Sequence, residues 1–226
     1  MMDLELPSHQ ARNYLLAYGV VAVYIATPPG GRPCMIGTSH DLTQSSSYIK
    51  RAWSPVVDIT RAWWVQTKEE AEALERAVIS VWWEQRINAT RLDITGEQAL
   101  NTITRIAFEK GITIHDHDDV MSKANSAVRK VTEEINHAQA TGGLKWFNRA
   151  YKAYRLACKA AGENVMPYDY VIVRLISVLV GRVARREVYK LDASLLDEVF
   201  VPKKAKKIGA VHRTVQQAVY SGVDER

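Results

Sequence analysis

The chain has 226 residues, of which 47% are hydrophobic and 24% are charged, and Gly and Pro occur at ordinary frequencies. A chain of this length can form one large domain or two small ones, and its composition excludes collagen-like, disulfide-scaffold and fully disordered proteins. The formal net charge is +5 at pH 7, and it is unevenly distributed along the chain.

The excess of positive charge belongs to the second half. Residues 1–88 hold 8 basic and 9 acidic side chains, whereas residues 89–226 hold 22 and 16. Because Lys and Arg that neutralise phosphates release condensed counterions, this asymmetry favours a polyanionic partner such as DNA. The alternative is an ordinary solvated face, which many proteins carry.

Neither a membrane span nor an export signal is expected. The longest apolar run, residues 171–183, is interrupted by Arg174 and Gly181 and is shorter than the roughly 20 residues that a membrane helix requires. The first residues, MMDLELP, lack the basic start and apolar stretch of a signal peptide. With Cys34 and Cys158 as the only cysteines, we expect a cytoplasmic protein.

The first half alternates apolar strands with helices. The turn sequence Pro28-Pro29-Gly30-Gly31 separates two apolar segments and predicts a hairpin. Thr67 and Glu70 have the spacing of a capping box, which predicts the start of a helix. The expected elements are strands over residues 18–27, 34–38 and 56–65 and helices over residues 43–53 and 67–87.

The second half shows helical spacing and no convincing strand. Gly162 and Pro167 indicate the end of one helix and the start of the next. The expected helices cover residues 96–110, 119–140, 144–161 and 167–189. We expect an α+β fold with a small sheet domain over residues 1–90, a helical basic domain over residues 91–200 and a mobile basic tail over residues 201–226.

Three segments of the first half occur in an informative order. They are Val23-Tyr24-Ile25, then Met35-Ile36-Gly37-Thr38-Ser39 followed by Asp41-Leu42, and then Glu70-Ala71-Glu72-Ala73-Leu74-Glu75. Over about residues 16–88 this order resembles the GIY-YIG nuclease family, particularly its compact phage and bacterial branch. The resemblance implies a small antiparallel sheet with helices and the metal-dependent cleavage of DNA.

The resemblance also implies roles for two residues. Tyr24 stands where the family has a hairpin tyrosine that helps to activate water, and Glu75 stands where it has the glutamate that holds one divalent metal, Mg²⁺ or Mn²⁺. Such a site is chemically reasonable, because a metal ion and a guanidinium stabilise the negative charge that develops when a phosphodiester is cleaved.

Two positions depart from the family pattern. Met35 replaces the second tyrosine and cannot exchange a proton, and Ser45 stands where the family has its phosphate-binding arginine. The nearest cations are Lys50 and Arg51, so Arg51 is the candidate phosphate clamp. A displacement of six residues corresponds to about 9 Å along a helix axis.

Plainer structural roles are the alternatives. Tyr24 could be a strand aromatic packed in the core, and Glu75, at the flank of an apolar helix face, could pair with Arg76 or Arg86 at the surface. The run His115-Asp116-His117-Asp118-Asp119 contains metal-ligand side chains, but a polar loop with a helix cap is the favoured interpretation.

Two further patterns concern nucleic acid. Of each of the pairs Trp63-Trp64 and Trp82-Trp83 we expect one member in the core and the other partly covered, the alternative being a base-stacking platform. In the long last helix, cations eleven residues apart point the same way and suit phosphate contacts. The candidate nucleic-acid-binding residues are Lys50, Arg149, Arg174, Arg182, Arg185, Lys203 and Lys204.

The sequence thus predicts a metal-dependent DNA endonuclease of GIY-YIG type, from a phage or mobile element. The first alternative is an inactive module of the same fold that binds DNA or a protein partner. The second is a structural or assembly protein of a phage-like particle. The preferred DNA, the biological process and the oligomeric state are not indicated by any motif.

Overall fold

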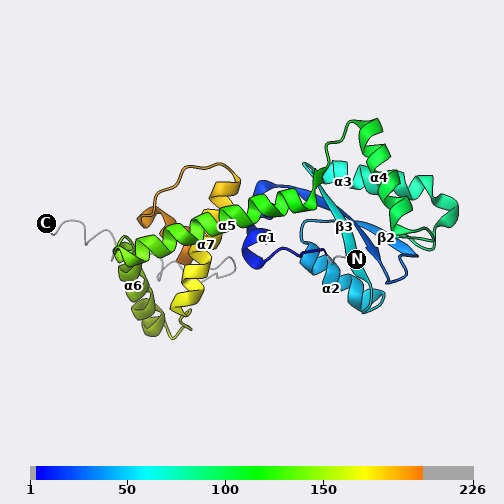
Figure 1. Cartoon of the computed structure of the whole chain (residues 1–226). Coiled ribbons are helices and arrows are strands. Elements are labelled where there is room, and N and C mark those ends of the chain that lie inside the picture. Colours follow the sequence, from blue (N-terminus) through cyan, green and yellow to red (C-terminus); the bar gives the residue numbers. More distant parts are fainter. Residues whose placement is uncertain (1–3, 201–226) are drawn as a thin grey trace. The chain divides into compact units, whose positions relative to one another are not determined.

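Figure 1 shows the computed structural model of the chain, which describes residues 4–200. The fold is α+β, as expected. Two units are distinguished, residues 1–125 and residues 126–226, and their division falls within helix α5 (His117–Ala140). The predicted basic tail, with Lys203 and Lys204, lies outside the described residues.

Unit 1 contains an antiparallel sheet with the strand order β4-β2-β1-β3-β5. The strands are β1 (Val21–Thr27), β2 (Cys34–Ser39), β3 (Asp58–Val65), β4 (Arg91–Leu92) and β5 (His115–Asp116). β1 and β2 form the predicted hairpin, in which Tyr24 lies opposite Gly37. All seven residues of β1 are buried, because it is the central strand and both faces of the sheet are covered.

Successive residues of β1 point to opposite faces of the sheet, and each face has its own core. Val23 and Ile25 pack with α3 (Lys68–Val81) and α4 (Gly96–Lys110). The opposite face, which includes Tyr24, packs with α1 (His9–Tyr18), α2 (Leu42–Ala52) and the start of α5.

Trp63 and Trp64 are both buried because helices cover both faces of the sheet. Trp63 contributes to the core under α3 and α4, and Trp64 to the core on the opposite face. The expectation that one of the two is only partly covered was therefore wrong. For the second pair the expectation was also wrong, because neither member is a core residue: Trp82 is half-buried against the core and Trp83 is 63% exposed.

Several elements of unit 1 differ from the sequence-based expectation. Helix α1 was not expected, although Ser8 caps its start and Gly19, with φ 84°, ends it in the left-handed conformation. α3 ends at Val81, before a short 3₁₀ helix η1 (Trp83–Gln85). β4 and β5 contain two residues each and lie in a part of the chain where no strand was expected.

In unit 2 the described residues form helices around an aromatic core. The elements after α5 are α6 (Lys145–Ala161), α7 (Tyr168–Ala184), the 3₁₀ helix η2 (Ala193–Leu195) and α8 (Leu196–Phe200). Phe147, Tyr154 and Phe200 are buried against one another, with ring centroids 5.6 Å apart for Phe147 and Phe200 and 5.2 Å for Tyr154 and Phe200. Among residues 4–200 no helix has the length and apolar character that crossing a membrane requires.

Candidate functional site

Tyr24 is held at a close contact between the two strands of the hairpin. Its side chain is 6% exposed and lies over Gly37, the residue opposite it on β2. A Cβ atom at position 37 would lie 2.6 Å from Cζ of Tyr24 and nearer still to its hydroxyl oxygen. The position therefore requires glycine if the Tyr24 ring is to stay where it is.

A chain of hydroxyl groups continues from Tyr24 into the start of α2. Tyr24 hydrogen-bonds with the hydroxyl of Ser45, in the first turns of α2, and Ser45 Oγ donates to Ser39 Oγ at 2.8 Å. Ser39 Oγ in turn accepts the backbone N–H of Asp41, the N-cap of α2, at 2.9 Å. The cap of α2 and the Tyr24 hydroxyl thus belong to one polar network.

Glu75 approaches the same edge of the hairpin from α3. The Thr38 hydroxyl, next to Gly37, donates a hydrogen bond to the Glu75 carboxylate. Burial raises the pKa of Glu75, and the negative charge of the neighbouring Glu72 raises it further. The hydrogen bond from Thr38 and the positive charge of Arg76 lower this pKa, but burial is the largest effect. A carboxylate that is kept partly desolvated, without an ion pair of its own among residues 4–200, is unusual outside functional sites.

Tyr24 and Glu75 are close enough to influence each other. Burial raises the pKa of Tyr24, and the negative charge of Glu75 raises it further, while the bond with Ser45 lowers it. The phenol is therefore protonated at neutral pH and can donate a hydrogen bond. The sequence named these two residues as water-activating group and metal ligand. The charge of Glu75 acts on Tyr24, whereas the side chain of Tyr24 packs on the sheet face opposite α3.

A pocket of about 540 Å³ opens at Glu75 and contains two arginines. Its lining includes Thr38, Glu72, Glu75, Arg76 and Arg86. In the sequence analysis both arginines were considered only as surface ion-pair partners of Glu75. They are instead a pair of cations beside the carboxylate, a combination that suits a phosphate group and its counterion.

Each arginine is oriented by other contacts. Arg76 pairs with Glu72 at 3.4 Å. Arg86 donates through Nε to the carbonyl oxygen of Asn88 at 2.8 Å, and its Cζ lies 4.7 Å from the ring centroid of Trp83. Arg86 is therefore fixed next to an exposed aromatic ring by a cation–π contact.

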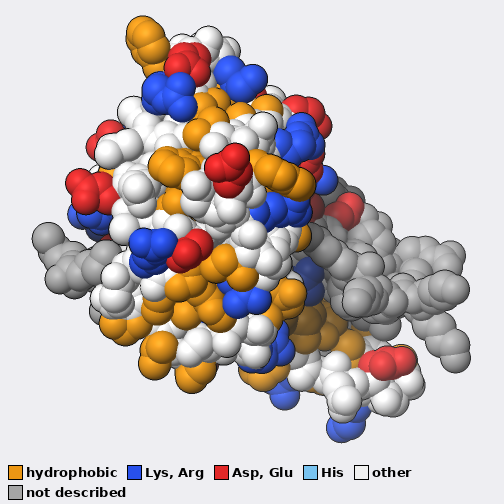
Figure 2. All heavy atoms as spheres, turned by 90° about the vertical axis from the view of Figure 1, so that its right-hand side faces the viewer, with side chains coloured by type: hydrophobic (Ala, Val, Ile, Leu, Met, Phe, Trp, Pro, Cys, Tyr) orange, Lys and Arg blue, Asp and Glu red, His pale blue; other side chains and the backbone are white. Residues whose placement is uncertain are grey.

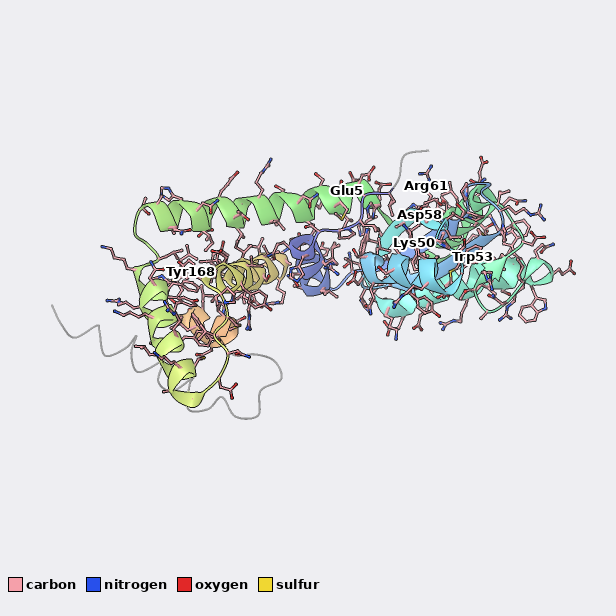
Figure 3. The ribbon with its side chains drawn as sticks, turned by 90° about the horizontal axis from the view of Figure 1, so that it is seen from below. Glu5, Lys50, Trp53, Asp58, Arg61 and Tyr168 are labelled. Atoms are coloured by element: carbon pink, nitrogen blue, oxygen red, sulfur yellow. The ribbon has the colours of Figure 1, made fainter. Side chains whose placement is uncertain are left out.

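Arg51 and Lys50 lie elsewhere. Arg51 is exposed and donates through Nε to the carbonyl oxygen of Ser47 in its own helix at 3.3 Å. Relative to Ser45 it is rotated by about 120° and displaced by about 9 Å along α2. Lys50 forms an ion pair with Asp58 at 2.6 Å, and Figure 3 shows the two residues with Trp53 and Arg61 at this side of unit 1. The structure does not bring Arg51 to the Tyr24 and Glu75 site.

The carboxylates of the pocket can be compared with the ligands that a divalent metal ion requires. Glu72 and Glu75 are one helical turn apart and line the same pocket. In residues 4–200 no group of three or more His, Cys, Asp or Glu side chains is arranged to hold a metal. One or two carboxylates nevertheless fit Mg²⁺, which keeps several of its waters when bound to protein.

The His115–Asp119 run has a structural role, but it is not the polar loop that was favoured: His115 and Asp116 form β5, and residues 117–119 begin α5. The Asp118 N–H donates to Asp116 Oδ1 at 2.8 Å at the start of α5. His117 is buried, and its Nδ1 accepts the indole N–H of Trp64 at 3.2 Å. Its Nε2 lies 2.8 Å from the carbonyl oxygen of Glu5, so both ring nitrogens have a hydrogen-bond partner.

The candidate nucleic-acid-binding cations of unit 2 fall into two classes. On α7, Arg182 pairs with Glu198, Arg185 pairs with Glu187 at 2.6 Å, and Arg174 donates to the carbonyl oxygen of Glu198 at 3.2 Å. These side chains hold the fold of unit 2. Arg149, on α6, is exposed.

Comparisons of the chain with protein-family models, with curated proteins and with solved structures found no match. The functional argument therefore rests on the residues and on the geometry of the site.

Proposed function

We propose that unit 1 cleaves phosphodiester bonds in DNA with the help of a divalent metal ion, in the manner of the GIY-YIG nucleases that the sequence resembles. The observation that carries the proposal is the position of Glu75 in a pocket that also contains Arg76 and Arg86, with the charge of Glu75 acting on Tyr24 of β1. A protonated phenol, a partly buried carboxylate and two guanidinium groups are the components that phosphodiester hydrolysis requires.

Each residue has a distinct role in this proposal. Glu75, supported by Glu72, holds Mg²⁺ or Mn²⁺, which when bound supplies Lewis-acid stabilisation of the phosphoryl oxygens. The Tyr24 hydroxyl orients the attacking water by a hydrogen bond. Arg86 takes the role of phosphate clamp that the sequence alone suggested for Arg51, because it lines the pocket and Arg51 does not.

The test is the conversion of supercoiled plasmid to nicked or linear DNA in Mg²⁺ or Mn²⁺. Glu75→Gln keeps the shape of the side chain and removes its charge, so we expect cleavage to fall by at least about a hundredfold. Glu69→Gln is the matched control, because Glu69 is an exposed carboxylate on the same helix and lies outside the pocket.

Two results of this assay would contradict the proposal. Cleavage that persists in excess chelator would show that no divalent ion is needed. Full activity in Glu75→Gln would show that the metal site lies elsewhere.

One observation favours a second candidate, a module of the same fold that binds DNA without cleaving it. Ser45 hydrogen-bonds with Tyr24 at the place where the family has its arginine, and Met35 packs against the core on the Tyr24 face. A wild-type protein that binds DNA and leaves plasmid intact in both metals would support this candidate.

The proposal includes a cytoplasmic location. Cys34 and Cys158 are both free and buried, and burial raises the pKa of Cys34 to about 11. Buried free thiols of this kind are compatible with a reducing compartment.

A further inference from the structure

The outer face of α6 carries a row of positive charge. Its sequence, KWFNRAYKAYRLACKAA, contains five basic residues and no acidic one. We call these side chains the α6 stripe; they are Lys145, Arg149, Lys152, Arg155 and Lys159. At 100° per residue all five fall within about 120° of the helix circumference, on one side of α6.

The opposite side of α6 fixes the direction of the stripe. Phe147, Ala150, Tyr154 and Cys158 are buried in unit 2, and all five cations are exposed. Over its 14-residue span the stripe extends for about 21 Å along the helix axis. It is therefore a surface feature held in place by the core behind it.

The cations of the stripe are not neutralised within the fold. Within residues 4–200 no carboxylate forms an ion pair with any of the five. Arg182 and Arg185 of α7, in contrast, are paired with Glu198 and Glu187. On the face of unit 1 that Figure 2 shows, basic and acidic side chains are interspersed. The unneutralised charge of α6 thus needs another explanation.

A pocket of about 420 Å³ lies on the stripe. Lys152, Arg155 and Lys159 line it together with the apolar side chains of Leu156 and Val165. Glu163 completes the lining, so one carboxylate faces three cations. Cations around a small apolar surface suit a phosphate attached to a sugar.

We propose that the α6 stripe binds the phosphate backbone of DNA. Five cations spread over about 21 Å can contact several phosphates of a duplex, each strand of which carries one phosphate per 3.4 Å of helix axis. The contact is to the backbone, and it carries no sequence preference of its own. The inference depends on the proposed function only for the choice of DNA as the probe, and it holds for a cleaving and for a non-cleaving protein.

An anionic membrane is the competing polyanion, and the structure argues against it. A helix that lies on a membrane inserts an apolar face between the lipids. The apolar face of α6 is buried in unit 2, and the exposed large apolar side chains beside the stripe are Leu156 and Val165, which do not form a continuous apolar face. Phosphate binding needs no insertion.

The test measures the affinity of the full-length chain for a fluorescent DNA duplex by anisotropy, in chelator so that no cleavage occurs, between about 50 and 200 mM salt. The triple variant Lys152→Gln, Arg155→Gln, Lys159→Gln removes three cations from the stripe. Because each phosphate contact contributes about 0.9 to the slope of log K against log salt, we expect the slope to fall by about 2 to 3 and the affinity to fall at least tenfold.

The matched control removes three exposed cations from α5, by Lys123→Gln, Arg129→Gln and Lys130→Gln. It changes the net charge equally, and we expect its salt slope to change by less than one. An equal loss in both triple variants would overturn the proposal, because net charge alone would then account for binding. An unchanged slope in the α6 variant would also overturn it.

Vesicles containing phosphatidylserine provide the last arm of the experiment. The proposal would be overturned if the wild-type protein sediments with these vesicles but does not bind the duplex, and if the α6 triple variant no longer sediments with them. The partner of the stripe would then be a lipid surface and not DNA. Glu69→Gln, which changes an exposed carboxylate outside the pocket of unit 1, should bind the duplex as the wild type does. A wild-type protein that binds the duplex in chelator but leaves plasmid intact in Mg²⁺ and Mn²⁺ would contradict the proposed cleavage and not the proposed binding, so the two failures are distinguishable.

Discussion

Glu75 is a residue at which stability and the proposed activity conflict. Its carboxylate is partly desolvated beside Glu72, and burial is the main reason that its pKa is raised. A raised carboxyl pKa means that the folded protein binds the proton more tightly than the unfolded chain does. The stability that this group contributes is present below the ordinary carboxyl pKa and is lost as pH rises through the folded pKa.

The resulting prediction is that Glu75→Gln stabilises unit 1 at pH 7 to 8. Thermal unfolding followed by circular dichroism should give a higher Tm for the variant at neutral pH, and the difference should disappear as the pH falls below about 4.5, where the wild-type carboxyl is protonated. Glu69→Gln should have the opposite sign at neutral pH, because it removes a negative charge from the first turn of α3. A lower Tm for Glu75→Gln would show that the carboxylate is a structural ion-pair partner.

Gly37 provides a second prediction at this scale, which concerns its close contact with the Tyr24 ring. A methyl group there would overlap the Tyr24 ring, which is enclosed by the core and cannot move without cost. We expect Gly37→Ala to lower the free energy of unfolding by about 1 to 3 kcal/mol. Urea denaturation measures this change.

Gly30 is the matched control for Gly37. A Cβ atom at Gly30 meets nothing within 4 Å, and its φ lies outside the left-handed region. We expect Gly30→Ala to change the free energy of unfolding by less than about 0.5 kcal/mol. Equal effects at the two positions would mean that Tyr24 does not press on Gly37.

At the scale of elements, local sequence signals were sufficient to predict a helix where that helix has its own capping residues. The expected helix over residues 96–110 is found with these bounds, because Thr95 and Gln98 form a capping box and Gly111 ends the helix. The Thr67 and Glu70 capping box likewise begins α3. Apart from α1 and the short α8, the helices and the three long strands were thus predictable from the spacing of neighbouring residues, although α3 and α7 end earlier than expected.

Long-range contacts explain most of what was missed. β4 and β5 contain two residues each, which is too short to show alternation, and they form because β2 and β3 offer unpaired edges. α7 ends at Ala184 rather than near residue 189. Just after this end, Arg186 adopts a positive φ of 59°, which the sequence does not signal.

The candidate site, like the secondary-structure elements, was predictable where a short sequence motif determines it and was not predictable where the tertiary fold does. The motif positions of Tyr24 and Glu75 indicated a shared site; the charge of Glu75 acts on Tyr24, but of the two residues Glu75 alone lines the pocket. The place of Arg86 in the pocket depends on η1 and on the bridge between Arg86 and Leu92, which are set by the tertiary fold. Spacing placed both Arg182 and Arg185 on the last long helix, but Arg182 lies on α7 and Arg185 is the residue that caps its end. Spacing also could not show that both are paired with carboxylates.

At the scale of the whole molecule, the division between the units falls at residue 125 rather than near residue 90. The change from strands to helices in the sequence suggested the earlier boundary. α4 is helical, but its buried side chains, with Leu92 and Ile94 before it, belong to the core under the sheet. The start of α5 contributes Val120 and Met121 to the opposite core. The type of secondary structure is thus a poor guide to which core a segment completes.

We therefore predict that a fragment of residues 1–125 folds by itself and that a fragment of residues 1–90 does not. The shorter fragment lacks Leu92, Ile94, Ile103 and Ile106, each of which contributes about 1.5 to 3 kcal/mol when fully buried. Their combined loss, about 6 kcal/mol or more, is comparable to the whole stability of a small domain, about 5 to 15 kcal/mol. Urea unfolding should be cooperative for residues 1–125 and absent for residues 1–90, whose exposed sheet face should also bind hydrophobic dyes. Cooperative unfolding of residues 1–90 would show that the three long strands and α3 form a sufficient core, and α4 would then be an accessory to the sheet.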